Sequence, residues 1–159
     1  MIATLNFQLT GQRALVTAGA QGIGLAITEA FLQQGAEVYI CDIDRTALDQ
    51  TKSKYPQVHI SHTDVGNESQ VLAMFADIQQ RFGQLDILVN NAGIAGPTAA
   101  IEDTILAEWQ QTLDVNLTGA FLCTRSAVPL IKKANGGSIV NISSAAGRHG
   151  FPLRSPYSA

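Results

Sequence analysis

The residues with the clearest chemical potential form a glycine-rich segment, Thr-Ala-Gly-Ala-Gln-Gly-Ile-Gly, at residues 17–24. Glycine lets a backbone approach a pyrophosphate closely, and the start of a helix offers free N–H groups and the positive end of the helix dipole. Many loops are glycine-rich for other reasons, but here a strand-like run precedes the segment and a helix-like run follows it. We therefore predict that Gly19, Gly22, Ile23 and Gly24 bind the pyrophosphate of a dinucleotide.

A dinucleotide site also needs a carboxylate at the end of the second strand, and the sequence has one there. Asp42 ends the second apolar run, 18 residues after Gly24, where an acidic side chain accepts hydrogen bonds from the adenosine ribose and repels a 2′-phosphate. Gln21, which is not basic, precedes Gly22. We therefore expect NAD in preference to NADP, although Arg45 could meet a phosphate. The alternative is that Asp42 is a solvated aspartate in a turn.

The elements that position these residues alternate along the chain. Short β-branched runs predict strands, and amphipathic runs predict helices between them. Strands are expected at residues 13–17, 36–41, 57–62, 85–90 and 138–142, and helices at 22–34, 44–54, 67–82 and 104–132. Crossovers of helical length between strands predict an α/β fold with a doubly wound parallel sheet and helices on both faces. Pattern alone leaves other doubly wound folds open.

Several helix ends carry local signals. Gly35 is expected to follow a helix C-terminus, and Asp44 to cap the next helix. Asn67, with Gln70 three residues later, approximates a capping box. Pro129 should bend or end the long helix. Ser155 followed by Pro156 resembles an N-cap and the first residue of a further helix.

Further strings are more specific than the glycine segment. They are Asp64-Val65, Asn90-Asn91-Ala92-Gly93, Asn116-Leu-Thr-Gly119, and Ser143-Ser144 with Tyr157 13 residues after Ser144. Together with the glycine segment they resemble the short-chain dehydrogenase/reductase family, from about residue 9 to residue 159. The resemblance implies a Rossmann-like sheet, and it predicts that residues 1–159 form one dinucleotide-binding domain whose last strands lie beyond the chain.

The resemblance also implies an activity, an NAD(P)-dependent oxidoreductase that acts on an alcohol or ketone substrate. Tyr157 would be the general acid/base, Ser144 would hold the substrate oxygen, and Asn116 would support a lysine and a proton-relay water. Hydride transfer to a carbonyl builds negative charge on oxygen, which requires such donors. Asp64 and Val65 would contact adenine, and Asn91, Ala92 and Gly93 would also bind the cofactor.

Simpler roles stand beside these. Asn116 could satisfy backbone groups in a helix kink, the two serines could form a plain turn, and Asn91 could tie the loops after the first and fourth strands together. A further alternative is a binding module that uses this fold for regulation rather than catalysis. The segment from Arg148 to Arg154 should border the substrate, and its charges suggest a polar or anionic one unless they face solvent.

Two positions depart from the family pattern. Ala18 stands where the family usually has glycine, so a positive φ there would strain it by roughly 1 kcal/mol unless Gly19 takes over the turn. The family motif YxxxK would place its lysine two residues beyond Ala159. We therefore expect the 159-residue chain to be a catalytically inactive dinucleotide-binding fragment, with Tyr157 mobile, residues 138–142 an open apolar edge, and a tendency to aggregate.

Composition narrows the partners. The chain has 159 residues, 46% of them hydrophobic and 14% charged, and a net charge of −3. The sequence has no cluster of Lys and Arg, so it predicts no basic surface that would bind nucleic acid or an anionic membrane. No apolar run approaches the roughly 18 residues of a membrane helix. Met1–Thr10 lack a secretory pattern, so we expect a cytoplasmic protein.

The cysteines and histidines indicate no metal site. Cys41 and Cys123 belong to no CxxC pair and are expected to be reduced and buried, and His59, His62 and His149 lack metal-ligand spacing. The family resemblance implies a homodimer or homotetramer formed through two long helices, in the full-length protein.

Overall fold

The computed structural model describes residues 8–159 of the chain. The expectation that the N-terminus carries no secretory segment falls, for residues 1–7, outside the described residues.

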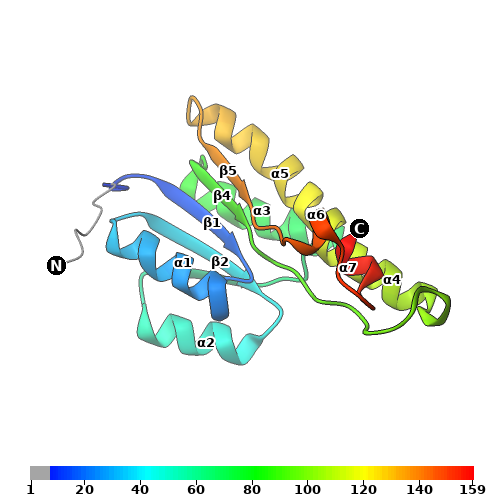
Figure 1. Ribbon diagram of the computed structural model, residues 1–159. Coiled ribbons are helices and arrows are strands. Elements are labelled where there is room, and N and C mark those ends of the chain that lie inside the picture. The colour runs from blue at the N-terminus through cyan, green and yellow to red at the C-terminus, as the bar shows by residue number, and fades with distance from the viewer. Residues whose placement is uncertain (1–7) are drawn as a thin grey trace.

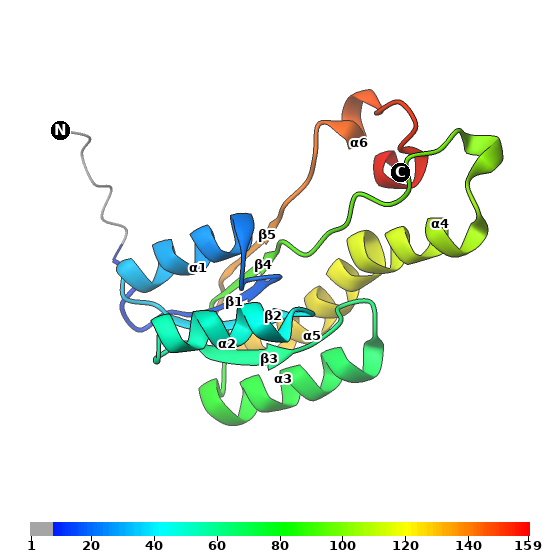
Figure 2. The ribbon, with the colours of Figure 1, turned by 90° about the horizontal axis from the view of Figure 1, so that it is seen from below.

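One parallel sheet organises the chain. Its strands are β1 (Arg13–Thr17), β2 (Glu37–Asp42), β3 (His59–His62), β4 (Ile87–Asn90) and β5 (Ser138–Asn141), in the order β3-β2-β1-β4-β5 (Figures 1 and 2). Every neighbouring pair is parallel. The predicted doubly wound, Rossmann-like α/β fold is therefore confirmed.

Helices cover both faces of this sheet (Figure 2). The pair α1 (Gly22–Gln33) and α2 (Arg45–Lys54) packs on one face, and α3 (Glu68–Phe82) and α5 (Gly119–Lys133) pack on the other. The two hydrophobic clusters beneath them share the central strands, whose successive side chains point to opposite faces. Because both faces are covered, β1 and β2 are buried almost throughout.

The predicted long helix has three parts. They are α4 (Leu106–Leu113), a π-helical segment η2 (Asp114–Thr118) and α5, with a short 3₁₀ turn η1 (Ile101–Asp103) before them. Pro129 does not end the helix, which continues to Lys133. Pro129 lies on the exposed side of α5, where solvent can reach the carbonyl group that loses its N–H donor.

Local capping was predicted well at two helices and wrongly at two points. Asp44 accepts the N–H of Ala47 at 3.0 Å, and Asn67 accepts the N–H of Gln70 at 3.2 Å. The side chain of Gln70 does not complete the capping box, because its oxygen accepts the N–H of Asp64 at 2.9 Å. Ser155 is the first residue of α7 (Ser155–Ser158) and makes no capping hydrogen bond.

The C-terminal residues stand beyond the carboxyl ends of the strands. There α7 lies beside α4, and α6 (Ala146–His149) lies beside α7 (Figures 1 and 2). At the opposite side of the sheet from β3, β5 forms an edge, with Ile139 37% and Val140 44% exposed. This open apolar edge agrees with the sequence prediction. Among the described residues, no helix combines the length and apolar character that crossing a membrane requires.

Candidate functional site

A cavity lies where the strand order reverses, between the loops that follow β1 and β4. Parallel α/β sheets bind ligands at this point, outside the carboxyl ends of the strands. The cavity has a volume of about 440 Å³. Seven of the ten residues predicted to bind a cofactor line it, namely Gly22, Asp42, Asp64, Val65, Asn91, Ala92 and Gly93. Gly19, Ile23 and Gly24 belong to the adjoining loop and helix start but are not part of this lining.

The glycine loop makes its turn at Ala18. Ala18 has φ +48°, whereas Gly19 has no positive φ, so the expectation that Gly19 might take over the turn is wrong. Gly19 is required for space instead, because a Cβ there would lie 2.7 Å from Ile40 Cγ2. Gly22 combines φ +56° with open space. The strain of roughly 1 kcal/mol therefore stays at Ala18.

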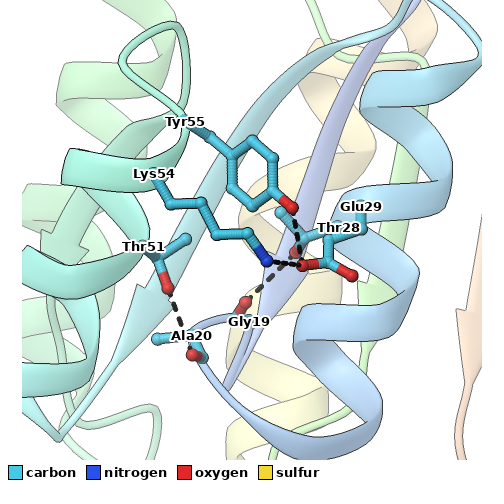
Figure 3. Close-up of polar contacts among 7 residues, drawn as sticks. All are labelled: Gly19, Ala20, Thr28, Glu29, Thr51, Lys54 and Tyr55. Atoms are coloured by element: carbon cyan, nitrogen blue, oxygen red, sulfur yellow. Dashed lines mark hydrogen bonds and ion pairs between the residues drawn. The ribbon is translucent and has the colours of Figure 1, made fainter.

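Two buried threonines hold the loop from behind. The Thr28 hydroxyl on α1 donates to the carbonyl oxygen of Gly19, and the Thr51 hydroxyl on α2 donates to that of Ala20, both at 3.2 Å (Figure 3). Sequence reasoning missed both residues. Each bond joins positions whose proximity depends on how a helix packs over the loop, so no local pattern indicates it.

Asp42 is fixed at the end of β2. Only 5% of the residue is exposed, and its two carboxylate oxygens accept the N–H groups of Ala20 at 3.3 Å and Asp44 at 3.1 Å. This burial contradicts the alternative of a solvated turn aspartate. A carboxylate offers about four acceptor positions, so Asp42 keeps acceptor capacity for a ligand in the cavity that it lines.

The loops after β1 and β4 are bound to each other. The hydroxyl oxygen of Thr17 accepts the N–H groups of Asn91 and Ala92, each at 2.9 Å. The side-chain amide of Asn91 donates to the carbonyl oxygens of Thr17 at 3.0 Å and Ala18 at 3.2 Å. Asn91 therefore ties these loops together, as the simpler reading held, while also lining the cavity. Thr17 was not singled out from the sequence.

Asn116 occupies the π-helical segment η2 and faces the loop after β4. Its side-chain oxygen accepts the N–H of Ile94 at 2.8 Å, and its side-chain nitrogen donates to the carbonyl oxygen of Ile94 at 2.9 Å. Asn116 therefore satisfies backbone groups of the loop after β4, and its catalytic role stays a prediction. π-helical turns occur frequently at functional sites, and this one directs Asn116 to the residue that follows Gly93.

Asn116 is not part of the cavity lining, and neither are the other two predicted catalytic residues, which lie in the C-terminal segment. Ser144 is exposed, and its hydroxyl oxygen accepts the N–H of Ala146 at 3.2 Å, which is the contact of a local turn. Tyr157 is half-buried on α7, which packs against α4 and α6. The mobility expected of Tyr157 is a property of the chain in solution and stays a prediction.

Arg154 fastens this segment to the loop after β4. Its guanidinium donates to the carbonyl oxygens of Ala95 at 3.1 Å and Gly96 at 2.8 Å, and the N–H of Ala99 donates to the carbonyl oxygen of Leu153 at 3.0 Å. One arm of Arg154 is therefore engaged by the protein itself, which weakens the suggestion that this arginine receives an anionic substrate. Arg148 and His149 are exposed on α6.

The thiols are core residues. Cys41 and Cys123 are free and buried. Burial disfavours the thiolate, so it raises the pKa of Cys123 to about 12 and that of Cys41 still further. Within residues 8–159 the structure holds no group of three or more His, Cys, Asp or Glu side chains that could bind a metal ion.

Comparison with known proteins agrees with this geometry. The sequence pattern of the family described as short chain dehydrogenase matches residues 12–159. A 2-dehydro-3-deoxy-L-rhamnonate dehydrogenase (NAD(+)) from Sphingomonas sp. (strain SKA58) is 35% identical over 149 residues, which cover 94% of this chain and 60% of that protein. The chain thus spans about 60% of the length of such curated relatives.

Solved structures share the fold. A short-chain dehydrogenase from Streptomyces avermitilis superposes with a TM-score of 0.87 at 33% identity, covering 94% of this chain and 55% of that one. An NAD⁺-bound xylitol dehydrogenase superposes with a TM-score of 0.89 at 29% identity, covering 94% and 59%. Family pattern, relatives and structures agree, and the chain belongs to the short-chain dehydrogenase family.

Proposed function

We propose that this chain forms the NAD-binding part of a cytoplasmic dehydrogenase that transfers hydride between a nicotinamide and an alcohol or ketone. The observation that carries the proposal is the buried carboxylate of Asp42, which lines the cavity beside the glycine loop. A relative whose name includes NAD(+) and a structural neighbour with NAD⁺ bound support it.

The residues present fit a dinucleotide. A Cβ at Gly24 would lie 1.9 Å from the carbonyl oxygen of Ala18, so the loop passes the helix start closely. The N–H of Leu25 donates the first hydrogen bond of α1, to the carbonyl oxygen of Gln21. The N–H groups of residues 22–24 precede this bond. Those groups would hold the pyrophosphate, Asp42 the adenosine ribose, and Asp64 and Val65 the adenine.

The bound nicotinamide would supply the hydride chemistry. The protein's part, carried over from the family, would be to hold the substrate oxygen at Ser144 and to move its proton at the hydroxyl of Tyr157. Asn116 would support the family's lysine and a proton-relay water. The polypeptide of residues 1–159, assayed alone, is expected to bind NAD without turnover, because the lysine of the family motif would follow Ala159.

The same proposal covers domain and assembly. Residues 1–159 would be one incomplete dinucleotide-binding domain, and the full protein a homodimer or homotetramer. Exposed apolar side chains along the long helical segment, at Leu106, Leu117 and Phe121, support association there.

Cofactor binding tests the proposal directly. Calorimetric titration of the chain should show NAD binding at least about tenfold tighter than NADP, because Asp42 repels a 2′-phosphate. Replacing Asp42 with Ala should weaken NAD binding by about tenfold or more, since hydrogen bonds to a charged group are lost. Asp49→Asn is the control, because Asp49 is exposed on α2 and the variant removes one negative charge, as Asp42→Ala does. It should leave both affinities unchanged. Equal affinity for NAD and NADP, or no binding of either, would contradict the proposal.

A further inference from the structure

We infer that Thr28 and Thr51 are positioning residues of the dinucleotide site, each acting through one peptide group of the glycine loop. The inference rests on the proposed function and extends it to two side chains that do not line the cavity. Thr51 would act on the pyrophosphate, and Thr28 would act on the ribose through Asp42.

Both hydroxyls are withdrawn from solvent and from the cavity. Thr28 is 0% exposed and Thr51 is 4% exposed. They come from different helices, and they hold two consecutive carbonyl groups of the loop (Figure 3). A buried carbonyl group is normally paired, but pairing on one side also fixes the plane of the peptide to which it belongs.

That plane determines where the next N–H points. Residues 8–159 contain no cis peptide bond, so each carbonyl is antiparallel to the N–H that follows it. With the carbonyl of Gly19 turned to Thr28, the N–H of Ala20 points the opposite way, where it donates to Asp42 at 3.3 Å. Thr28 therefore helps to hold the carboxylate that would bind the ribose.

The same reasoning applies to the next peptide. With the carbonyl of Ala20 held by Thr51 on α2, the N–H of Gln21 points away from α2. Gln21 lines the cavity and precedes the first turn of α1, whose free N–H groups are the natural anion-binding donors. Thr51 would therefore add the N–H of Gln21 to the donors available to the pyrophosphate.

The position of Thr51 depends in turn on how α2 is held against α1. The carboxylate of Glu29 on α1 accepts hydrogen bonds from the Tyr55 hydroxyl at 2.7 Å and from Lys54 at 3.0 Å (Figure 3). The hydrogen bond from Tyr55, and then that from Lys54, lower the pKa of Glu29. These contacts lie at the end of α2, one turn beyond Thr51, so they help to set the distance over which its hydroxyl reaches the loop.

The test separates the two routes by using two ligands, NAD and adenosine, which lacks phosphates. Thr51→Val should weaken NAD binding by about fivefold, the effect of one misdirected hydrogen bond, and leave adenosine binding unchanged. Thr28→Val should weaken both ligands by similar factors, because it acts through the ribose contact. Thr51→Ser and Thr28→Ser, which keep the hydroxyl, should restore the affinities.

Thr112→Val is the matched control for the loss of a buried hydroxyl. Thr112 is 0% exposed, and its hydroxyl bonds to the carbonyl oxygen of Glu108 within α4. This variant should lower the melting temperature and leave both affinities unchanged. All titrations are made below the melting transition of each variant, so that affinity is compared among folded proteins.

The outcomes are distinct. If the unchanged chain binds no NAD, the proposed function fails before the threonines are tested. If it binds NAD and the Val variants, while folded, bind both ligands as the parent does, only the further inference is overturned. A Thr51→Val variant that weakens NAD and adenosine equally would also overturn it, because the hydroxyl would then support the fold as a whole.

Discussion

Gly24 faces Asn91 so closely that a Cβ on Gly24 would lie 2.6 Å from the side-chain nitrogen of Asn91. The same Cβ would meet the carbonyl oxygen of Ala18, which that nitrogen binds. One absent methyl group thus permits the contact between the helix start, the glycine loop and the loop after β4.

Gly24→Ala should therefore abolish detectable NAD binding and lower the free energy of unfolding by several kcal/mol, as overpacking against backbone does. Gly22→Ala is the comparison, since its Cβ would stand in open space and only the positive φ opposes it, at about 1 kcal/mol. Urea denaturation and NAD titration of both variants measure the difference. Two variants of equal stability would show that the close contact at Gly24 does not constrain the site.

Ala18→Gly should stabilise the protein. Ala18 adopts φ +48°, which glycine accepts without steric strain, so the free energy of unfolding should rise by about 0.5–1 kcal/mol. Ala20→Gly, two residues away and without a positive φ, should instead lower it by a similar amount, because glycine gains freedom in the unfolded chain. Chemical denaturation checks both signs, and a fall in stability for Ala18→Gly would refute the assignment of strain.

Asn116→Asp should destabilise the loop after β4. The variant keeps an acceptor for the N–H of Ile94 but replaces the donor that binds the carbonyl oxygen of Ile94. Two oxygens would then face each other, and the expected loss is about 1–3 kcal/mol. Gln110→Ala removes an exposed amide that binds Asp114 and should cost less than about 0.5 kcal/mol. Melting temperatures of the two variants provide the test.

The two buried thiols predict how stability depends on pH above neutrality. Burial raises the pKa of Cys123 from 9.0 to about 12, so the folded state keeps its proton where the unfolded state loses it. The unfolded state then binds fewer protons, and stability should fall as the pH rises through this interval. Cys41 acts in the same direction. Urea midpoints across the interval should decline less steeply for Cys123→Ala, and an unchanged slope would count against a buried thiol.

The open edge at β5 predicts self-association of residues 1–159. Val140 is 44% exposed beside Ile139 on this edge, and exposed apolar edge strands template pairing between chains. Size-exclusion chromatography should show large species, which Val140→Lys should reduce because a charged edge residue opposes pairing. A sharp monomeric peak with cooperative melting for the unchanged chain would contradict the prediction.

Much of this structure follows from local sequence. The capping contacts of Asp44 and Asn67 involve residues three positions apart, so their spacing alone predicts them. The hydrogen-bond partner of the Gln70 side chain cannot be predicted from spacing alone. The chain before α3 turns back, so that the N–H of Asp64 reaches the side-chain oxygen of Gln70. Sequence proximity thus predicts one half of a capping box and tertiary geometry decides the other.

The residues of the candidate site also fall into two groups, those predictable from local sequence and those whose contacts depend on tertiary packing. Asp42 and the glycines are predictable because each stands at a fixed place after a strand. Thr28 and Thr51 are not, since their bonds depend on the packing of two helices over one loop. For Ser144 and Tyr157, the family resemblance gives the assignment, and the described contacts of Ser144 are those of a turn.

The position of β1 in the middle of the sheet affects how the chain is made. Its partner β4 contains Ile87, which pairs with Ala14, so a ribosome adding about 5–20 residues per second reaches that partner roughly 4–15 s after β1 is synthesised. Until then one side of this central strand has no neighbour, and the hydroxyl oxygen of Thr17 lacks the N–H groups of Asn91 and Ala92 that it accepts in the folded chain. The nascent chain therefore passes through an interval in which its glycine loop is held from the α1 and α2 side only.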